Sequence, residues 1–198
     1  MGNKKLSSLV LLSLSSALVL AACGGEGSTA DSSESAGAND SDQVLNLIES
    51  AEIPTMDSVQ ATDTVAFTAL SNVNEGLYRQ GLDGTVELGI AAEDPTVSED
   101  GLVYTFTIRD EANWSNGEPV TAEDFVYSWR KLVDPAEAAS YSYMMAGVIA
   151  NATEIIDGAV APEELGVKAI DEKTLEITLT SPVPYFKDLL TLAMFFPQ

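Results

Sequence analysis

The chain has no histidine, a single cysteine and few basic residues. Histidine is the usual general base of serine and cysteine hydrolases and a frequent ligand of transition metals, so the commonest forms of both sites are excluded. One cysteine cannot form an internal disulfide or a zinc site built from several thiolates. Carboxylates are abundant, but no spacing singles out a catalytic pair. We therefore expect no enzyme activity, no metal site and no cofactor.

Positive charge is scarce as well, because 31 acidic residues face nine basic ones and the formal net charge is −22 at pH 7. A field of this sign repels phosphate backbones and anionic lipid head groups within about a Debye length. Nucleic acid is therefore excluded as a partner. The hydrophobic fraction of 45% is large enough for a folded body with an acidic, solvated surface.

The first residues are typical of an export signal. Lys4 and Lys5 precede an apolar run over residues 9–22, which is shorter than the roughly 20 residues that a membrane-spanning helix needs. The run ends in Leu-Ala-Ala directly before Cys23, and small side chains at this place are typical of a cleavage site. This ending resembles a bacterial lipobox, in which the cysteine thiol takes a diacylglyceryl group. We predict a lipoprotein signal peptide over residues 1–22, although an ordinary secretory signal followed by a coincidental cysteine is the alternative.

Residues 23–42 are rich in Gly, Ser, Ala and acidic residues and contain no large apolar side chain. Such a segment cannot bury enough surface to offset its chain entropy, so we expect a flexible tether. Two acyl chains on Cys23 would supply stable anchoring, which one chain does not. These features predict a soluble body held at the outer face of the cytoplasmic membrane.

The remaining sequence predicts alternating strands and helices and hence an α/β or α+β body. The helix over residues 122–133 has the clearest signals, because Thr121 and Asp124 can form a capping box and Asp134-Pro135 ends it. Period-two alternation predicts a half-buried strand over residues 102–109. Further helices are predicted at residues 63–75, 135–149 and 185–192, and further strands at residues 43–49, 77–79, 165–170 and 174–179. The sequence ends at Gln198 directly after an apolar stretch, and for this reason we expect a fragment.

Several motifs together carry a family resemblance. The most specific is WSNGEPVTAEDFVYSW at residues 114–129. The others are NEGL at 74–77, DGLVYTFTIR at 100–109, LGVKAID at 165–171 and SPVPYF at 181–186. This series, which covers roughly residues 44–186, resembles the peptide- and nickel-binding family of extracellular solute-binding proteins (family 5), and within it the oligopeptide receptors of ABC importers.

The resemblance implies a periplasmic-binding-protein-like type II (cluster C) fold with two lobes, present here only as its N-terminal portion. Residues 43–76 would begin lobe I and residues 77–198 would form the smaller lobe. The family binds its ligand between lobes, and a peptide can be held there as an added strand. The implied partners are an oligopeptide and the membrane subunits of an ABC permease, and we expect a monomer.

Carried over by position, Thr62, Asp63 and Thr64 fall where related receptors lay main chain against the peptide, and Tyr141 falls on a tyrosine that lines the same cleft. The better-known members have an acidic residue and a glycine where this chain has Thr62 and Asp63. A main-chain contact with the peptide is compatible with that change. A charge interaction at position 62 is not implied, because threonine carries no charge. Thr62 or Asp63 can also serve as the cap of the helix that follows, and Tyr141 can belong to the core.

Two further readings stay open at the level of sequence. One is a receptor for another ligand, such as a signalling peptide, a dipeptide, nickel or haem. The other is a surface adhesin or an extracytoplasmic folding helper that keeps the scaffold without transport. The LGVKAID motif argues against nickel.

Overall fold

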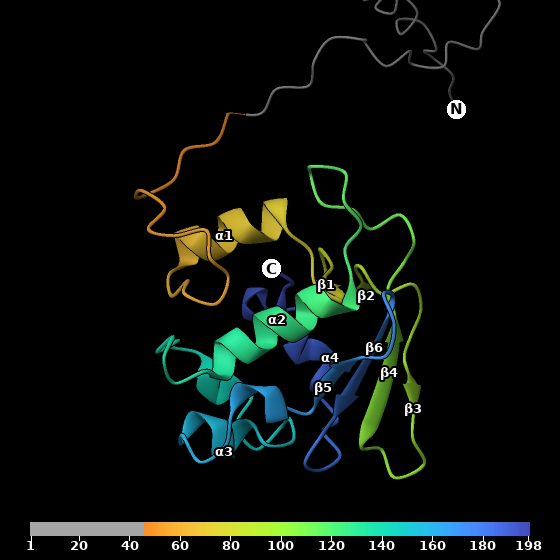
Figure 1. Ribbon diagram of the computed structural model, residues 1–198. Coiled ribbons are helices and arrows are strands. Elements are labelled where there is room, and N and C mark those ends of the chain that lie inside the picture. The colour runs from red at the N-terminus through yellow and green to blue at the C-terminus, as the bar shows by residue number, and fades with distance from the viewer. Residues whose placement is uncertain (1–45) are drawn as a thin grey trace, which may run out of the picture. The chain divides into compact units, whose positions relative to one another are not determined.

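The computed structural model describes residues 46–198, and residues 47–198 form one compact unit (Figure 1). The predictions for the signal peptide, for Cys23 and for the tether lie outside the described residues. Within the described part, helices and strands are mixed, so the α/β class is confirmed. The proposed division between residues 43–76 and 77–198 stays a prediction.

A four-stranded antiparallel sheet forms one side of the body, with the strand order β3-β4-β6-β5. Its strands are β3 (Thr96–Val97), β4 (Val103–Thr107), β6 (Thr174–Thr178) and β5 (Val167–Ala169). In the central pair, Phe106 lies opposite Leu175 and Tyr104 opposite Ile177. Alternate side chains of β4 therefore face the core, as the period-two pattern predicts. The predicted strands at residues 102–109, 165–170 and 174–179 are confirmed with shorter bounds.

A small second sheet pairs β1 (Tyr78–Gln80) with β2 (Val86–Leu88). The connection turns at Gly84, whose φ of 80° lies in the left-handed region that a side chain disfavours. Gly117, in the loop before α2, has a φ of 89° and likewise allows a turn that a side chain would disfavour. Strand β2 was not predicted from the sequence.

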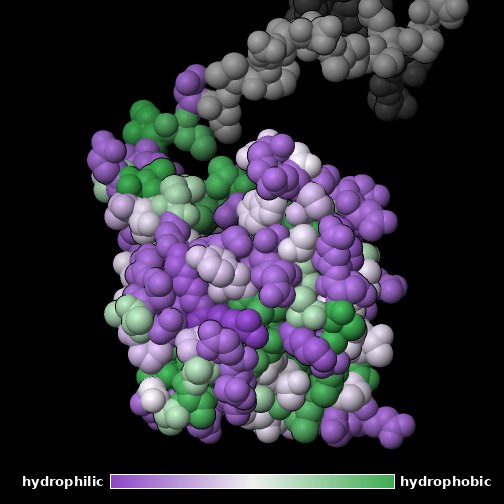
Figure 2. Space-filling view, viewed as in Figure 1, coloured by the Kyte–Doolittle hydropathy of each residue, from purple (hydrophilic) through white to green (hydrophobic). Residues whose placement is uncertain are grey.

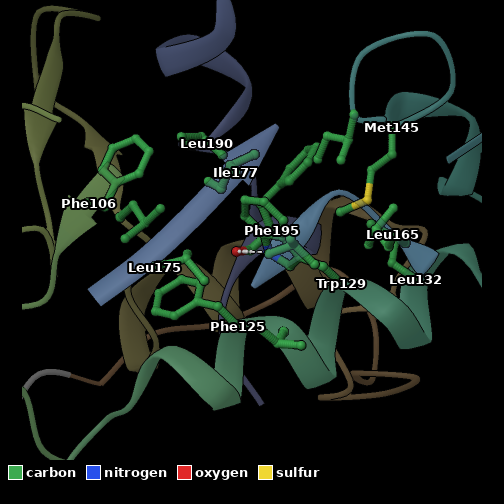
Figure 3. Packing of buried hydrophobic residues seen from close by; sticks show 14 of the residues in the cluster. Phe106, Phe125, Trp129, Leu132, Met145, Leu165, Leu175, Ile177, Leu190 and Phe195 are labelled. Carbon is green, nitrogen blue, oxygen red and sulfur yellow. Dashed lines mark hydrogen bonds between the residues drawn. The ribbon is translucent and has the colours of Figure 1, made fainter. Parts of the chain in front are cut away.

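Helix α2 (Ala122–Val133) covers one face of the four-stranded sheet and has the predicted bounds. Thr121 and Asp124 form the expected capping box. The helix buries Phe125, Trp129 and Leu132, and the indole Nε1 of Trp129 donates to the carbonyl oxygen of Phe195 at 2.9 Å (Figure 3). This aromatic core, which also includes Phe106 from β4, is the centre of the body.

Shorter elements complete the body. They are α1 (Thr64–Val73), η1 (Ser142–Met144), α3 (Ala152–Ile156), η2 (Pro162–Glu164), α4 (Phe186–Leu189) and η3 (Ala193–Phe195). The prediction of a helix near residues 63–75 is confirmed, although it ends at Val73 with Asn74 as its C-cap and not at Gly76. The predicted helix over residues 185–192 shrinks to the single turn of α4.

Two predicted elements are wrong. Residues 135–149 do not form a helix, because Ala138 and Gly147 adopt positive φ values of 51° and 70° and only a short 3-10 turn lies between them. Residues 46–49 are not a strand, and Leu47 and Ile48 are 70% and 98% exposed. A lone strand is unstable without hydrogen-bonded neighbours, and no described strand pairs with this segment.

The surface agrees with the composition, because the face in Figure 2 is largely hydrophilic with scattered apolar residues. The apolar stretch at the end of the sequence is packed against the body. Phe195 and Phe196 are buried, at 1% and 3% exposure, by contacts with α2 and α1.

Candidate functional site

The segment before α1 has an extended backbone at its exposed end. Asp63 is the N-cap of the helix, with φ −124° and ψ 159°, and its Oδ1 accepts a hydrogen bond from the N–H of Ala66 at 3.0 Å. Thr62 and Thr64 are exposed on either side. Asp63, and not Thr62, is therefore the helix cap, which leaves the Thr62 side chain without that role.

The main chain of this segment has unused hydrogen-bonding groups. Among residues 46–198, the N–H groups of Thr62, Asp63 and Thr64 and the carbonyl oxygen of Thr62 have no protein partner. Thr64 lies at the first helical position, where the N–H has no partner within a helix. An extended segment with free donors and acceptors can accept another chain as an added strand.

Tyr141 lies beside α1, although it is far from that helix in the sequence. Its ring centroid is 5.8 Å from that of Phe67, with the planes inclined by 58°. Tyr141 is half-buried and packs against the main core. Phe67 follows Asp63 by one helical turn, so Tyr141 packs on the same helix that Asp63 caps.

Phe67 was not among the predicted site residues. Its spacing from Asp63 is the one signal in the sequence that could have found it, because residues four apart lie on the same helix face. The neighbouring Tyr143 was also missed. Its ring centroid is 6.0 Å from that of Tyr141.

A polar cluster fixes the chain that leads to Thr62. The Asp57 carboxylate lies 2.6 Å from the Lys131 ammonium on α2. The amide of Gln198 donates to Asp57 Oδ1 at 2.7 Å and to Ser58 Oγ at 2.8 Å. Segments from both ends of the described chain therefore meet on α2.

The same cluster shifts the protonation of its charged members. Burial by itself raises the pKa of Asp57, but hydrogen bonds from Lys131, Gln198 and the Val59 N–H outweigh burial and hold that pKa below its ordinary 3.8. Burial lowers the pKa of Lys131, but the hydrogen bond with Asp57 raises it above 10.5 overall. Both directions mean that the charged pair is favoured in the folded state.

Acid should weaken this cluster. Because the pKa of Asp57 is lower in the folded than in the unfolded chain, its stabilisation is complete above pH 3.8 and is lost as the pH falls through the folded value. We expect Asp57→Asn to lower the free energy of unfolding by about 1–3 kcal/mol at neutral pH. The difference from the wild type should shrink below pH 3.8 in urea denaturation experiments. The exposed Asp110→Asn serves as the control, and a pH-independent difference for Asp57→Asn would contradict this role.

Helix α1 is also held by apolar contacts. Ala61, Ala66 and Leu70 are fully buried against Ala193 and Phe196. The hydroxyl of Ser128 on α2 donates to the carbonyl oxygen of Phe196 at 2.7 Å. In contrast, Val73 at the end of the helix is 68% exposed.

Two cavities lie along α1 but do not contain the predicted site residues. A cavity of about 520 Å³ is bounded by α1 and the chain around η3, and one of about 410 Å³ lies around the ion pair of Glu75 with Arg109. Neither is lined by Thr62, Asp63, Thr64 or Tyr141. The predicted site residues therefore lie outside both cavities, although Phe67 lines the larger one.

In residues 46–198, no three His, Cys, Asp or Glu side chains are grouped so that they could hold a metal ion. No helix in this part of the chain is long and apolar enough to cross a bilayer.

The model of the bacterial extracellular solute-binding proteins, family 5 (middle), matches residues 85–198, which is more than half of the chain. The chain belongs to this family. Its members bind solutes and are not enzymes, so the expectation of a non-enzymatic protein is confirmed.

The chain is 38% identical over 194 residues to the oligopeptide-binding protein OppA of Bacillus subtilis (strain 168). This alignment covers 98% of the chain and 35% of that relative. The chain is 40% identical over 146 residues to a dipeptide-binding protein of Lactococcus lactis subsp. cremoris (strain MG1363), covering 74% and 26%. A structure of Listeria monocytogenes OppA bound to peptide matches with a TM-score of 0.75 and 49% identity, over 78% and 30% of the two chains. The chain thus spans about a third or less of the length of these family 5 proteins.

Proposed function

We propose that the chain is part of an extracytoplasmic receptor that captures oligopeptides and delivers them to an ABC-type permease. The observation that carries the proposal is the exposed main chain at Thr62–Thr64, with unused donors and an acceptor, beside the half-buried ring of Tyr141. Relatives at 38–49% identity that carry peptide-binding names support the ligand class.

In the proposed complex, the peptide lies against Thr62, Asp63 and Thr64 as an added strand. Main-chain hydrogen bonds do not depend on side-chain identity, so this mode tolerates peptides of varied sequence. The change to Thr62 and Asp63 does not disturb it, because the Asp63 carboxylate is used as a helix cap. Tyr141 forms the adjoining wall.

Anchoring through Cys23 belongs to the same proposal. A diacylglyceryl group on Cys23 would hold the protein at the outer face of the cytoplasmic membrane, with residues 23–42 as the tether. This position places the receptor next to its permease. The signal-like residues 1–22 and the placement of the single cysteine directly after them support it.

Binding measurements with two lengths of chain test the function. Because the chain spans 26–35% of the curated relatives, we expect a second wall of the cleft to come from sequence beyond these 198 residues. The complete chain encoded by the gene should bind pentapeptides with micromolar or tighter affinity in titration calorimetry, and residues 23–198 alone should bind them at least about a hundredfold more weakly.

Dipeptides in the same titration separate a dipeptide receptor from an oligopeptide receptor. Absence of any peptide binding by the complete chain would contradict the proposed function. Micromolar binding by residues 23–198 alone would contradict the two-walled cleft.

A further inference from the structure

Three aromatic rings form a continuous row between α1 and η1. The ring of Tyr141 lies 5.8 Å from Phe67 on one side and 6.0 Å from Tyr143 on the other, with interplanar angles of 58° and 41°. Phe67 and Tyr141 are half-buried, whereas Tyr143 is 60% exposed. The row therefore begins in the core and ends in solvent.

The row starts at Phe67, which follows Asp63 by one turn of α1. Side chains on a helix lean toward its N-terminus, so we expect the ring of Phe67 to lean toward the first turn of α1. Tyr141 and Tyr143 continue from there along η1. A chain that pairs with residues 62–64 would thus have the aromatic row beside it.

Tyr143 differs from the other exposed tyrosines. Tyr127 and Tyr185 are 58% and 55% exposed, and within residues 46–198 neither forms a ring pair. Tyr143 is held by Tyr141, which is held in turn by Phe67. A ring that is fixed by neighbours loses less entropy when a ligand packs on it.

The segment that carries Tyr141 and Tyr143 is itself uncharged. Residues 138–150 contain no acidic or basic side chain, in a chain of which 20% is charged and whose net charge is −22. A cationic peptide side chain would find no carboxylate within this segment. Aromatic and large aliphatic side chains gain from contact with ring faces without such a partner.

We propose that Tyr143, positioned by Tyr141, forms a specificity wall that favours an aromatic or large aliphatic side chain in the bound peptide. The inference rests on the proposed peptide-binding function and adds the class of side chain that the site selects. Because side chains of a strand alternate between its two sides, the preference applies only to peptide residues that face the row.

The test compares pentaalanine with pentapeptides that carry a single phenylalanine or lysine at each position in turn, titrated into the complete encoded chain. We expect phenylalanine at one or two alternate positions to tighten binding about tenfold, and lysine at those positions to give no gain. Tyr143→Ala should reduce the phenylalanine gain about three- to tenfold while changing pentaalanine affinity less than about twofold. Tyr143→Phe should keep the gain, and Tyr127→Ala, a tyrosine of matched exposure, should leave both affinities unchanged.

The possible outcomes distinguish a failure of the specificity wall from a failure of the proposed peptide-binding function. Peptides that bind without a phenylalanine preference, or with a preference that survives Tyr143→Ala, would overturn the specificity wall and leave the proposed function intact. A preference for lysine that Tyr143→Ala removes would also overturn it, in favour of a cation site. If no pentapeptide binds, both the function and the wall are wrong.

Discussion

Replacement of Trp129 by alanine should lower the free energy of unfolding by about 3–5 kcal/mol, the range for removing a large buried aromatic side chain. Trp129 has no exposed surface. Its ring packs edge-on against the rings of Phe125 and Phe195, at centroid distances of 6.4 and 5.6 Å. Its Nε1 donates a hydrogen bond to the carbonyl oxygen of Phe195. The substitution thus removes packing and a buried hydrogen bond together. Urea denaturation followed by circular dichroism measures the change.

Two variants separate these contributions. Trp129→Phe keeps most of the ring but leaves the Phe195 carbonyl without its donor, so we expect a smaller loss of about 1–3 kcal/mol. Tyr127→Ala changes an aromatic residue two positions away on the same helix that is 58% exposed, and should cost less than about 0.5 kcal/mol. A loss below about 1 kcal/mol for Trp129→Ala would mean that α2 is not the centre of the core.

The proposed peptide site predicts a large effect from one proline. Thr64 is the first residue of α1, where proline is well tolerated, and Asp63 already has the extended dihedrals of −124° and 159° that a residue before proline prefers. Thr64→Pro should therefore leave the fold intact and remove only an N–H that has no partner among the described residues. If this N–H binds the peptide main chain, affinity should fall about tenfold or more in titration calorimetry of the complete chain.

Thr64→Ala is the matched control, because it removes the exposed side chain and keeps the N–H. We expect its peptide affinity to stay within about twofold of the wild type. Equal losses in both variants would assign binding to the threonine side chain. No loss in Thr64→Pro would show that this donor does not face the peptide.

The elements that the sequence predicted well are those with local signals at both ends. Helix α2 matches its prediction because the Thr121–Asp124 capping box starts it and Asp134-Pro135 ends it, and both are properties of a few neighbouring residues. Strand β4 alternates apolar and polar residues along its length, which identifies its buried face without knowledge of its partners.

The wrong predictions fall where distant contacts decide the local structure. Residues 135–149 have helical spacing of apolar residues, but burial of Met145 and Ile149 in the core accompanies the positive φ values at Ala138 and Gly147. The short strands β2 and β3 lie in positions that only pairing with β1 and β4 defines. Helix α3 begins after Asn151 at a φ of 65°, a conformation that composition does not indicate.

The candidate site shows the same division. The family resemblance predicted Thr62, Asp63, Thr64 and Tyr141 as site residues, but it did not predict how these residues are arranged in space. The contact between Tyr141 and Phe67 joins segments that are far apart in the sequence, and no local pattern predicts it. The sequence offers both Thr62 and Asp63 as the cap of α1, and only the hydrogen bond from the Ala66 N–H to Asp63 decides between them.

Hydrogen exchange of the amides at residues 62–65 in the complete encoded chain tests the main-chain pairing most directly. These N–H groups lack protein partners ahead of the first helical hydrogen bonds, so we expect fast exchange in the free protein. Saturation with a pentapeptide should slow exchange of at least one of them by about tenfold or more. Peptide binding that leaves all four amides unprotected would contradict an added strand at this segment.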